Sequence, residues 1–264
     1  MSVVTSTQTT SHRPSYLAFS DVDETLIDRK SMFDFMRFQL VSRYGSTGEE
    51  QYRRIAQGLQ RKAAAGAPRS TVNRDYYREY AGESAAQLEA LGREWFEVSA
   101  ADPGFFIRET LDELAEHRAA GAEIVLVSGS FLPCLAPIAE RVGAAHVLCT
   151  TPIVLDGVYT GEVFEPMIGD GKRSAVLRML AEHPGVSPLA CYAFGDHPSD
   201  FPMLDCVGNP RGVGDEPLMR AYLDRRNEEA SNRRRGNPGC AVACWSMGNG
   251  HEDACQGDCA FPLG

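Results

Sequence analysis

The chain has 264 residues, of which 43% are hydrophobic and 23% charged, a composition typical of a soluble globular protein with a sizeable core. Its formal net charge of −10 argues against a nucleic-acid binder, because such a protein would usually carry a basic face. No apolar run approaches the ~20 residues that a membrane-spanning helix needs. We therefore expect neither nucleic acid nor membrane among its partners.

The N-terminal part begins with a polar arm and continues into one strand. Residues 1–14 are rich in Ser and Thr and lack the apolar segment of a signal peptide, so we expect a disordered arm and a cytoplasmic protein. The apolar run 16–19 then predicts a buried strand. Two carboxylates, Asp21 and Asp23, follow this strand directly in an acidic turn.

The next seventy residues favour helices. Apolar spacing predicts a helix over 31–44, a loop over 45–50, and helices over 51–65 and 74–81. A further helix is expected from about Ser84. No strand pattern interrupts this region, so we predict a helical cap over 31–101, inserted after the first strand.

After a helix predicted over 106–120, the pattern changes to one of alternating strands and helices. The continuous apolar run 124–127 is typical of a parallel strand buried on both faces. Asp156-Gly157 lies between two short apolar runs and predicts a hairpin. A helix over 172–182 and a strand over 191–194 follow. The order predicts an α/β fold with a doubly wound parallel sheet.

These patterns also predict the domain organisation. The core domain should comprise 15–30 and 102–224, on either side of the cap. A polar stretch over 225–239 contains three consecutive arginines and a Gly-Asn-Pro-Gly run, which indicates a linker. The last segment, 240–264, is a cysteine-rich tail.

Polar side chains follow three of the predicted strands. Asp21 and Asp23 come after the first, Ser128 after the second and Asp196 after a later one. Because the carboxyl ends of parallel strands share one edge of a sheet, we expect these side chains to converge on one ligand site. Carboxylates in such a cluster would repel one another, and hard oxygen ligands suit Mg²⁺, so we expect this cofactor.

Four segments together resemble the haloacid dehalogenase superfamily, in particular its phosphoserine-phosphatase-like branch. They are Phe19-Ser20-Asp21-Val22-Asp23-Glu24-Thr25-Leu26, Val127-Ser128-Gly129, Gly171-Lys172-Arg173 and Gly195-Asp196-His197-Pro198-Ser199-Asp200. The resemblance covers about 16–224. It implies a Rossmann-like core and a phosphatase that forms an aspartyl-phosphate intermediate.

The resemblance also assigns roles to these residues. Asp21 would attack phosphorus, and Asp23 would protonate the leaving group and then activate water. Ser128, Gly129 and Lys172 would bind the phosphoryl oxygens. The ligands of Mg²⁺ would be Asp21, the backbone carbonyl of Asp23, Asp196 and Asp200, the last of them either binding the ion or orienting its ligands.

Three functions remain open at this stage. A cap suits small substrates, which favours a magnesium-dependent phosphatase acting on a small phosphorylated metabolite. Phosphotransfer to an acceptor other than water would use the same groups. A non-catalytic phosphate-binding scaffold, whose tail recruits a partner, is the third possibility. The sequence does not indicate the substrate or the oligomeric state.

The eight cysteines fall into two groups. Cys134, Cys149, Cys191 and Cys206 lie in apolar surroundings and are expected to be free thiols. The tail holds the rest, and it would bind zinc with His251 nearby, form two disulfides, or stay reduced and disordered. These four are Cys240, Cys244, Cys255 and Cys259.

Overall fold

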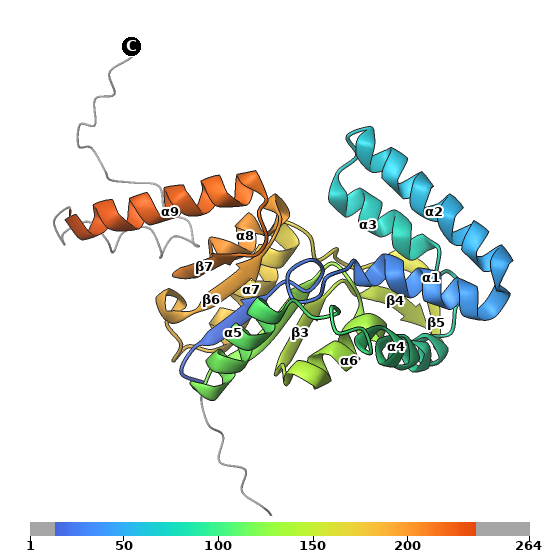
Figure 1. The fold of residues 1–264 in the computed structure, drawn as a ribbon, viewed down its shortest axis with the longest axis horizontal. Coiled ribbons are helices and arrows are strands. Elements are labelled where there is room, and N and C mark those ends of the chain that lie inside the picture. The colour runs from blue at the N-terminus through green and yellow to red at the C-terminus, as the bar shows by residue number, and fades with distance from the viewer. Residues whose placement is uncertain (1–13, 236–264) are drawn as a thin grey trace, which may run out of the picture. The chain divides into compact units, whose positions relative to one another are not determined.

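The computed structural model describes residues 14–235, and the side chains as far as residue 232 (Figure 1). Two compact units make up the chain, Met1–Leu223 and Asp224–Gly264. The predicted arm, except Pro14, and the whole cysteine tail lie outside the described residues. The proposed zinc or disulfide chemistry of the tail therefore stays a prediction.

A parallel five-stranded sheet forms the centre of the first unit, as the sequence predicts. Its spatial order is β3-β2-β1-β6-β7, so the chain moves outward from β1 to β3 and then returns to the other side of β1. The strands are β1 (Leu17–Ser20), β2 (Glu123–Ser128), β3 (His146–Cys149), β6 (Tyr192–Gly195) and β7 (Asn209–Gly212).

Helices cover both faces of this sheet because alternate strand residues point to opposite sides. Ala18 and Ile124 pack toward α5 and α6, whereas Leu17 and Val125 pack toward α7 and α8. Apolar residues on both faces explain the continuous apolar runs in these strands. The helices are α5 (Arg108–Ala119), α6 (Leu132–Val142), α7 (Asp170–Glu182) and α8 (Phe201–Leu204), with short 3₁₀ turns at Pro188–Ala190 and Pro198–Asp200.

Four helices follow β1 and precede α5 in the chain, in the region predicted to be a cap. The predicted loop over 45–50 is wrong, because α2 already begins at Ser46. Gly48 permits this, since a Cβ there would lie 2.0 Å from the carbonyl oxygen of Leu40 on the preceding helix. The helices are α1 (Ser31–Tyr44), α2 (Ser46–Ala64), α3 (Arg69–Arg78) and α4 (Ala85–Ala100).

The predicted hairpin is present and has a second role. β4 (Pro152–Leu155) and β5 (Val158–Val163) are antiparallel around Asp156 and Gly157, both with positive φ. Tyr159 in β5 exchanges backbone hydrogen bonds with Gly82 and Glu83, in the connection between α3 and α4. The hairpin, which the sequence assigned to the core domain, thus also forms hydrogen bonds with the predicted cap.

The segment 225–239, predicted to be a linker, is helical as far as Arg235. A helix, α9 (Pro217–Arg235), occupies most of this stretch. Pro217 suits the first turn of a helix, and the following Leu, Met, Ala, Arg and Glu residues favour helix until Gly236.

Two further predictions concern residues within the described range. Cys134, Cys149 and Cys191 are free thiols, as expected, and Cys206 is buried. Of the helices described, none combines the length and the apolar character that crossing a bilayer requires.

Candidate active site

The acidic turn lies where the chain order of the sheet reverses. The amide of Asp21 donates a hydrogen bond to the carbonyl of Phe194 at 3.0 Å, which joins the end of β1 to the end of β6. Ligand sites of open α/β sheets lie at such switch points. Glu24 adopts a left-handed conformation (φ 61°), and its amide donates to Ile27 at 2.8 Å, so the turn closes tightly behind the two aspartates.

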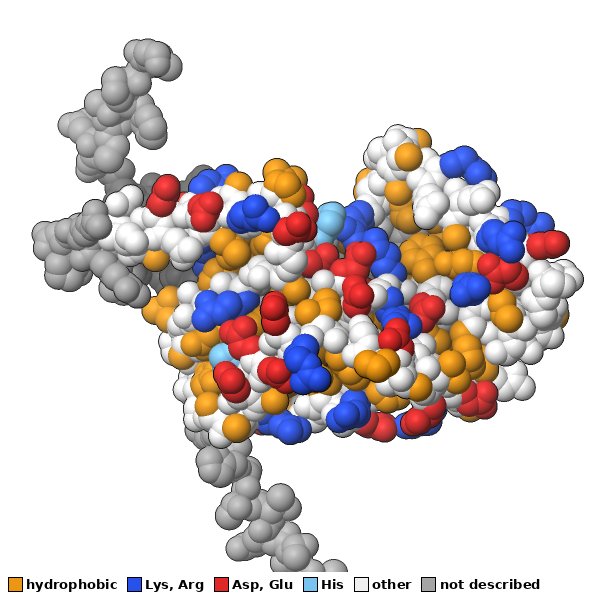
Figure 2. Space-filling view, viewed as in Figure 1, with side chains coloured by type: hydrophobic (Ala, Val, Ile, Leu, Met, Phe, Trp, Pro, Cys, Tyr) orange, Lys and Arg blue, Asp and Glu red, His pale blue; other side chains and the backbone are white. Residues whose placement is uncertain are grey.

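A pocket of about 90 Å³ opens at this edge of the sheet. Figure 2 shows acidic and basic side chains and a histidine gathered in the hollow between α8 and the α2–α3 pair. The lining residues are Asp21, Asp23, Glu24, Lys30, Met32, Phe33, Arg69, Ser128, Gly129, Ile168, Lys172, Asp196, His197 and Ser199.

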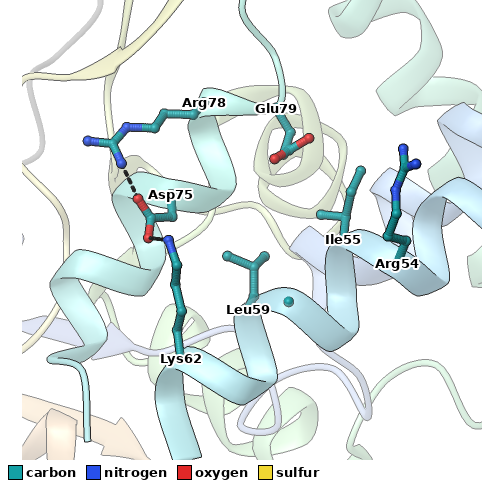
Figure 3. A pocket seen from close by; sticks show the side chains of 8 residues that line it. Arg54, Ile55, Leu59, Lys62, Asp75, Arg78 and Glu79 are labelled. Atoms are coloured by element: carbon teal, nitrogen blue, oxygen red, sulfur yellow. Dashed lines mark hydrogen bonds and ion pairs between the residues drawn. The ribbon is translucent and has the colours of Figure 1, made fainter. Parts of the chain in front are cut away.

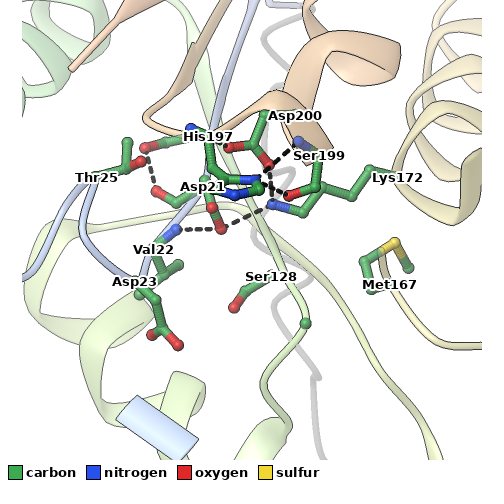
Figure 4. Close-up of polar contacts among 12 residues, drawn as sticks. Asp21, Val22, Asp23, Thr25, Ser128, Met167, Lys172, His197, Ser199 and Asp200 are labelled. Atoms are coloured by element: carbon green, nitrogen blue, oxygen red, sulfur yellow. Dashed lines mark hydrogen bonds and ion pairs between the residues drawn. The ribbon is translucent and has the colours of Figure 1, made fainter. Parts of the chain in front are cut away.

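Lys172 connects two of the predicted carboxylates (Figure 4). Its Nζ lies 2.9 Å from Oδ1 of Asp21 and 2.7 Å from Oδ1 of Asp200, and only 2% of the residue is exposed. Burial alone would lower the pKa of Lys172, but the carboxylates of Asp200 and Asp21 raise it above its ordinary value. The ammonium therefore stays charged at neutral pH.

Asp21 is buried beside this ammonium. Burial raises the pKa of its carboxyl well above the ordinary value; the Lys172 ammonium opposes this, while Asp200 and Asp23 add to it. Oδ1 of Asp21 also accepts a hydrogen bond from the amide of Val22 at 2.7 Å. A divalent cation at this cluster would favour the ionised, nucleophilic form of Asp21.

Asp23 lies apart from this cluster, although it is only two residues away. Its side chain points toward the start of α1, where Oδ1 accepts a hydrogen bond from the amide of Ser31 at 3.0 Å (Figure 4). Burial raises the pKa of Asp23 to about 6, and the hydrogen bonds from Ser31 oppose the rise. A carboxyl with this pKa can both donate and accept a proton near neutral pH.

Three of the predicted metal-binding carboxylates come together. One carboxylate oxygen from each of Asp21, Asp196 and Asp200 lies within 4.8 Å of the others. Thr25 holds Asp196 by donating to its Oδ1 at 3.0 Å, and burial raises the pKa of Asp196. This all-oxygen donor set fits Mg²⁺. The side chain of Asp23, in contrast, does not belong to the group.

Ser128 and Gly129 form the opposite wall. The Gly129 carbonyl accepts hydrogen bonds from Asn73 (2.9 Å), Tyr77 (3.0 Å) and Thr150 (2.9 Å), so two residues of α3 fix this peptide. The amide of Ser130 donates to Oγ of Ser128 at 3.1 Å. Since Oγ already accepts there, the hydroxyl hydrogen of Ser128 can be donated to an anion in the pocket.

His197, part of the fourth sequence segment, directly precedes the 3₁₀ turn at Pro198–Asp200. Its Nδ1 accepts from the amide of Ser199 at 3.0 Å and lies 2.7 Å from a guanidinium nitrogen of Arg69. These donors require a neutral ring with its proton on Nε2, and burial and Arg69 both lower the pKa of His197.

Sequence reasoning missed Arg69, Asn73 and Tyr77. It began the helix at residue 74, whereas α3 begins at Arg69, immediately after Pro68. The Gly66-Ala67-Pro68 break was the available signal, because a helix often starts just after a proline. Even so, a helix boundary alone would not have revealed contacts with Gly129 or His197.

A larger hollow of about 430 Å³ lies between α2 and α3 (Figure 3). Its one buried carboxylate, Asp75, is paired with Lys62 at 2.5 Å and with Arg78. The acid is therefore already neutralised by two cations, and no second carboxylate converges on it as in the smaller pocket. The smaller pocket at the sheet edge is the better candidate for chemistry.

Comparisons with known proteins identify the family of the chain. The family model described as haloacid dehalogenase-like hydrolase matches residues 18–205. The chain is 41% identical to a probable phosphatase of Mycobacterium tuberculosis over 120 residues. This match covers 43% of this chain and 42% of that protein. A phosphoserine phosphatase of the same organism is 30% identical over 223 residues, or 80% of this chain and 69% of that protein.

Among solved structures, a Bordetella pertussis protein of unknown function has a TM-score of 0.71 and 26% identity. The match covers 81% of this chain and 96% of that one. An α/β hydrolase with a parallel sheet and carboxylates at its carboxyl edge is thus the class that the fold and pocket define. The chain belongs to the haloacid dehalogenase-like hydrolase family.

Proposed function

We propose that the protein is a Mg²⁺-dependent phosphatase that hydrolyses small phosphate monoesters through an aspartyl-phosphate intermediate. The observation that carries this proposal is the different surroundings of two nearby carboxylates. Asp21 lies against the Lys172 ammonium and two further carboxylates, whereas Asp23 lies outside that cluster with a pKa of about 6. One is suited to be a nucleophile and the other an acid and base.

In the first step, an Asp21 oxygen forms a bond to phosphorus while the bond from phosphorus to the substrate oxygen breaks. Asp23 gives its proton to the departing alkoxide. In the second step, Asp23 takes a proton from water, the water oxygen bonds to phosphorus, and the Asp21 carboxylate is released with inorganic phosphate. Asp23 is then protonated again, ready for the next substrate.

The remaining groups stabilise the charge of the transferred phosphoryl group. Lys172 offers a buried ammonium, and the Ser128 hydroxyl and the backbone amide of Gly129 offer hydrogen-bond donors on the opposite wall. Asp21, Asp196 and Asp200 would hold Mg²⁺, which neutralises phosphate charge when bound. Asp200 also fixes Lys172 at 2.7 Å.

The mouth of the pocket indicates a class of leaving group. Lys30 and Arg69 both line it, and Lys30 is paired with Glu24 at 3.1 Å. Among the described residues, Arg69 has no carboxylate within ion-pair distance, and its guanidinium forms a hydrogen bond with the neutral His197. We infer that Arg69 binds a second acidic group of the substrate, such as a carboxylate.

The main test is hydrolysis of an aryl phosphate in the presence of Mg²⁺, comparing wild type with Asp21→Asn. We expect the substitution to abolish turnover. Asp28→Asn is the matched control, because Asp28 is an exposed carboxylate of the same segment that does not line the pocket. Equal activity of Asp21→Asn and wild type would refute the proposal and favour a non-catalytic phosphate-binding protein.

Two further measurements address the acceptor and the leaving group. If alcohols or sugars added to the assay become phosphorylated at the expense of released phosphate, the enzyme is a phosphotransferase instead. For the leaving group, Arg69→Gln should raise KM for a phosphorylated hydroxy acid and leave KM for a phosphorylated neutral alcohol unchanged. An equal rise for both substrates would contradict the role of Arg69 in recognition.

A further inference from the structure

A second cluster of potential metal ligands lies at the amino-terminal ends of the strands, opposite the pocket. Glu123 is the first residue of β2, His146 is the first residue of β3, and His183 directly follows the last residue of α7. One ligand atom from each lies within 4.8 Å of the others. Within the described part of the chain, this is the only such cluster besides the carboxylates of the pocket.

The two clusters are well separated. β2 carries Glu123 at its start and Ser128 at its end, and five steps of about 3.3 Å place them roughly 16 Å apart. α7 gives a similar result, since Lys172 and His183 are eleven residues apart, or about 16 Å at 1.5 Å per residue. The second cluster is therefore not part of the catalytic pocket.

Its distances suit a metal ion with a tetrahedral shell. Oε2 of Glu123 lies 3.0 Å from Nε2 of His146 and 3.6 Å from Nε2 of His183. Metal–ligand bonds of about 2.0–2.2 Å place two ligands of a tetrahedral Zn²⁺ site roughly 3.3 Å apart. The three side chains are partly exposed, with 37%, 31% and 18% exposure for His146, Glu123 and His183, so water can complete the shell.

The orientation of His183 also favours a metal ion at this cluster. Its Nδ1 lies 2.8 Å from the carbonyl oxygen of Met179. A carbonyl only accepts, so Nδ1 must carry the hydrogen, and in the neutral ring the lone pair of Nε2 faces the Glu123 carboxylate. Two electron pairs that face each other repel unless a proton or a metal ion lies between them. A backbone carbonyl that fixes the tautomer in this way is typical of metal-bound histidine.

We propose that Glu123, His146 and His183 bind a divalent transition-metal ion, for which Zn²⁺ is the matching probe. Two imidazoles and one carboxylate suit Zn²⁺ and related ions better than Mg²⁺, which prefers an all-oxygen shell. Because its ligands come from β2, from β3 and from the residue after α7, the bound ion joins three elements. It should therefore stabilise the folded chain, since the unfolded chain does not hold the three ligands together.

The test is a Co²⁺ titration of the full-length protein in excess Mg²⁺, with Zn²⁺ as competitor. Co²⁺ in a tetrahedral nitrogen–oxygen site absorbs in the visible range, whereas thiolate ligands add charge-transfer bands in the near ultraviolet. Replacing Cys240, Cys244, Cys255 and Cys259 by Ser removes the tail as a competing site. We expect one equivalent of Co²⁺ to bind in this background with visible bands, and Zn²⁺ to displace it.

Two near-isosteric substitutions remove one ligand each. His183→Asn can still donate to Met179, and His146→Gln can still donate to Glu123, but neither offers an imidazole. Each should weaken Zn²⁺ binding by at least about tenfold and abolish the rise in Tm caused by Zn²⁺. Glu182→Gln is the control, because it removes a neighbouring exposed carboxylate and should bind Zn²⁺ like wild type.

Tm without metal checks that the variants are folded, independently of any hydrolytic activity. Absence of visible Co²⁺ bands at one equivalent would overturn the proposal. Unchanged Zn²⁺ affinity in folded His146→Gln and His183→Asn would overturn it as well. In either case the cluster is a hydrogen-bonded network that does not hold a metal ion.

Discussion

Replacement of Lys172 by Met tests the electrostatics of the candidate active site most directly. The Lys172 ammonium lies between two carboxylates at 2.9 and 2.7 Å, and the side chain of Asp200 is fully buried. Methionine keeps the apolar stem and much of the volume, so the main loss is the positive charge. Removing one partner from a buried ion pair costs about 3–5 kcal/mol, because the remaining charge is left uncompensated.

For a unit of this size, that loss corresponds to a Tm lowered by roughly 6–20 °C in metal-free buffer. The effect should depend on pH. Without Lys172, the pKa of Asp21 rises further above its value in the unfolded chain, so folding requires more proton uptake. The difference from wild type should therefore be largest at pH 8 and should shrink as the pH falls toward 5. Saturating Mg²⁺ should also reduce it.

The assay is thermal unfolding followed by calorimetry at both pH values, with and without Mg²⁺. Lys30→Met is the matched control, since Lys30 is a half-exposed lysine of the same pocket paired with Glu24, and it should change stability by less than about 1 kcal/mol. A loss below about 1 kcal/mol for Lys172→Met at pH 8, or a loss that does not depend on pH, would refute the reasoning. With Mg²⁺ present, the same variant should lose about 10²–10³ in kcat.

Three further predictions concern other residues. The Asp23→Asn variant should release one equivalent of phenol from an aryl phosphate in a burst and then turn over slowly. Its rate with an alkyl phosphate should be lower than that of wild type by about 10²–10⁴. Similar steady turnover of both substrates would contradict the role of Asp23. In wild type, kcat/KM for the alkyl phosphate should fall as the pH rises through about 6, since Asp23 then loses its proton, and a pH profile without this limb would exclude Asp23 as the acid. Gly92→Ala should lower the free energy of unfolding, measured by chemical denaturation, by about 1–3 kcal/mol or more, because the new Cβ would lie 1.9 Å from the Pro133 carbonyl oxygen. Gly58→Ala is the control: no atom lies within 4 Å of the new Cβ, so this variant should be more stable by roughly 0.5–1 kcal/mol.

Much of the core could be predicted from local sequence. The apolar run 124–127 indicated a doubly buried strand, and β2 is buried on both faces. Asp21, Ser128 and Asp196 lie at the carboxyl ends of strands that are parallel neighbours, so their convergence followed from the strand directions alone. Alternation and turn chemistry act over a few residues, and a sequence shows them directly.

The surroundings of these residues depended on the tertiary structure. Arg69 and Tyr77 reach His197 and Gly129 from α3, across sequence separations of 128 and 52 residues. Helical periodicity shows which face of a helix is apolar, but it does not show which part of the chain that face will meet. The different surroundings of Asp21 and Asp23 likewise depend on which of them lies near Lys172.

The second metal-ligand cluster has the same origin. Glu123, His146 and His183 show no motif spacing, and each is unremarkable in its own segment. They meet because β3 pairs with β2 so that His146 lies opposite Val125, while α7 packs across the same strands and ends beside them. The sequence by itself determined the strands, the helices and the acidic turn. Strand register and helix packing decided which side chains share a site, because both depend on many contacts between residues that are far apart in the sequence.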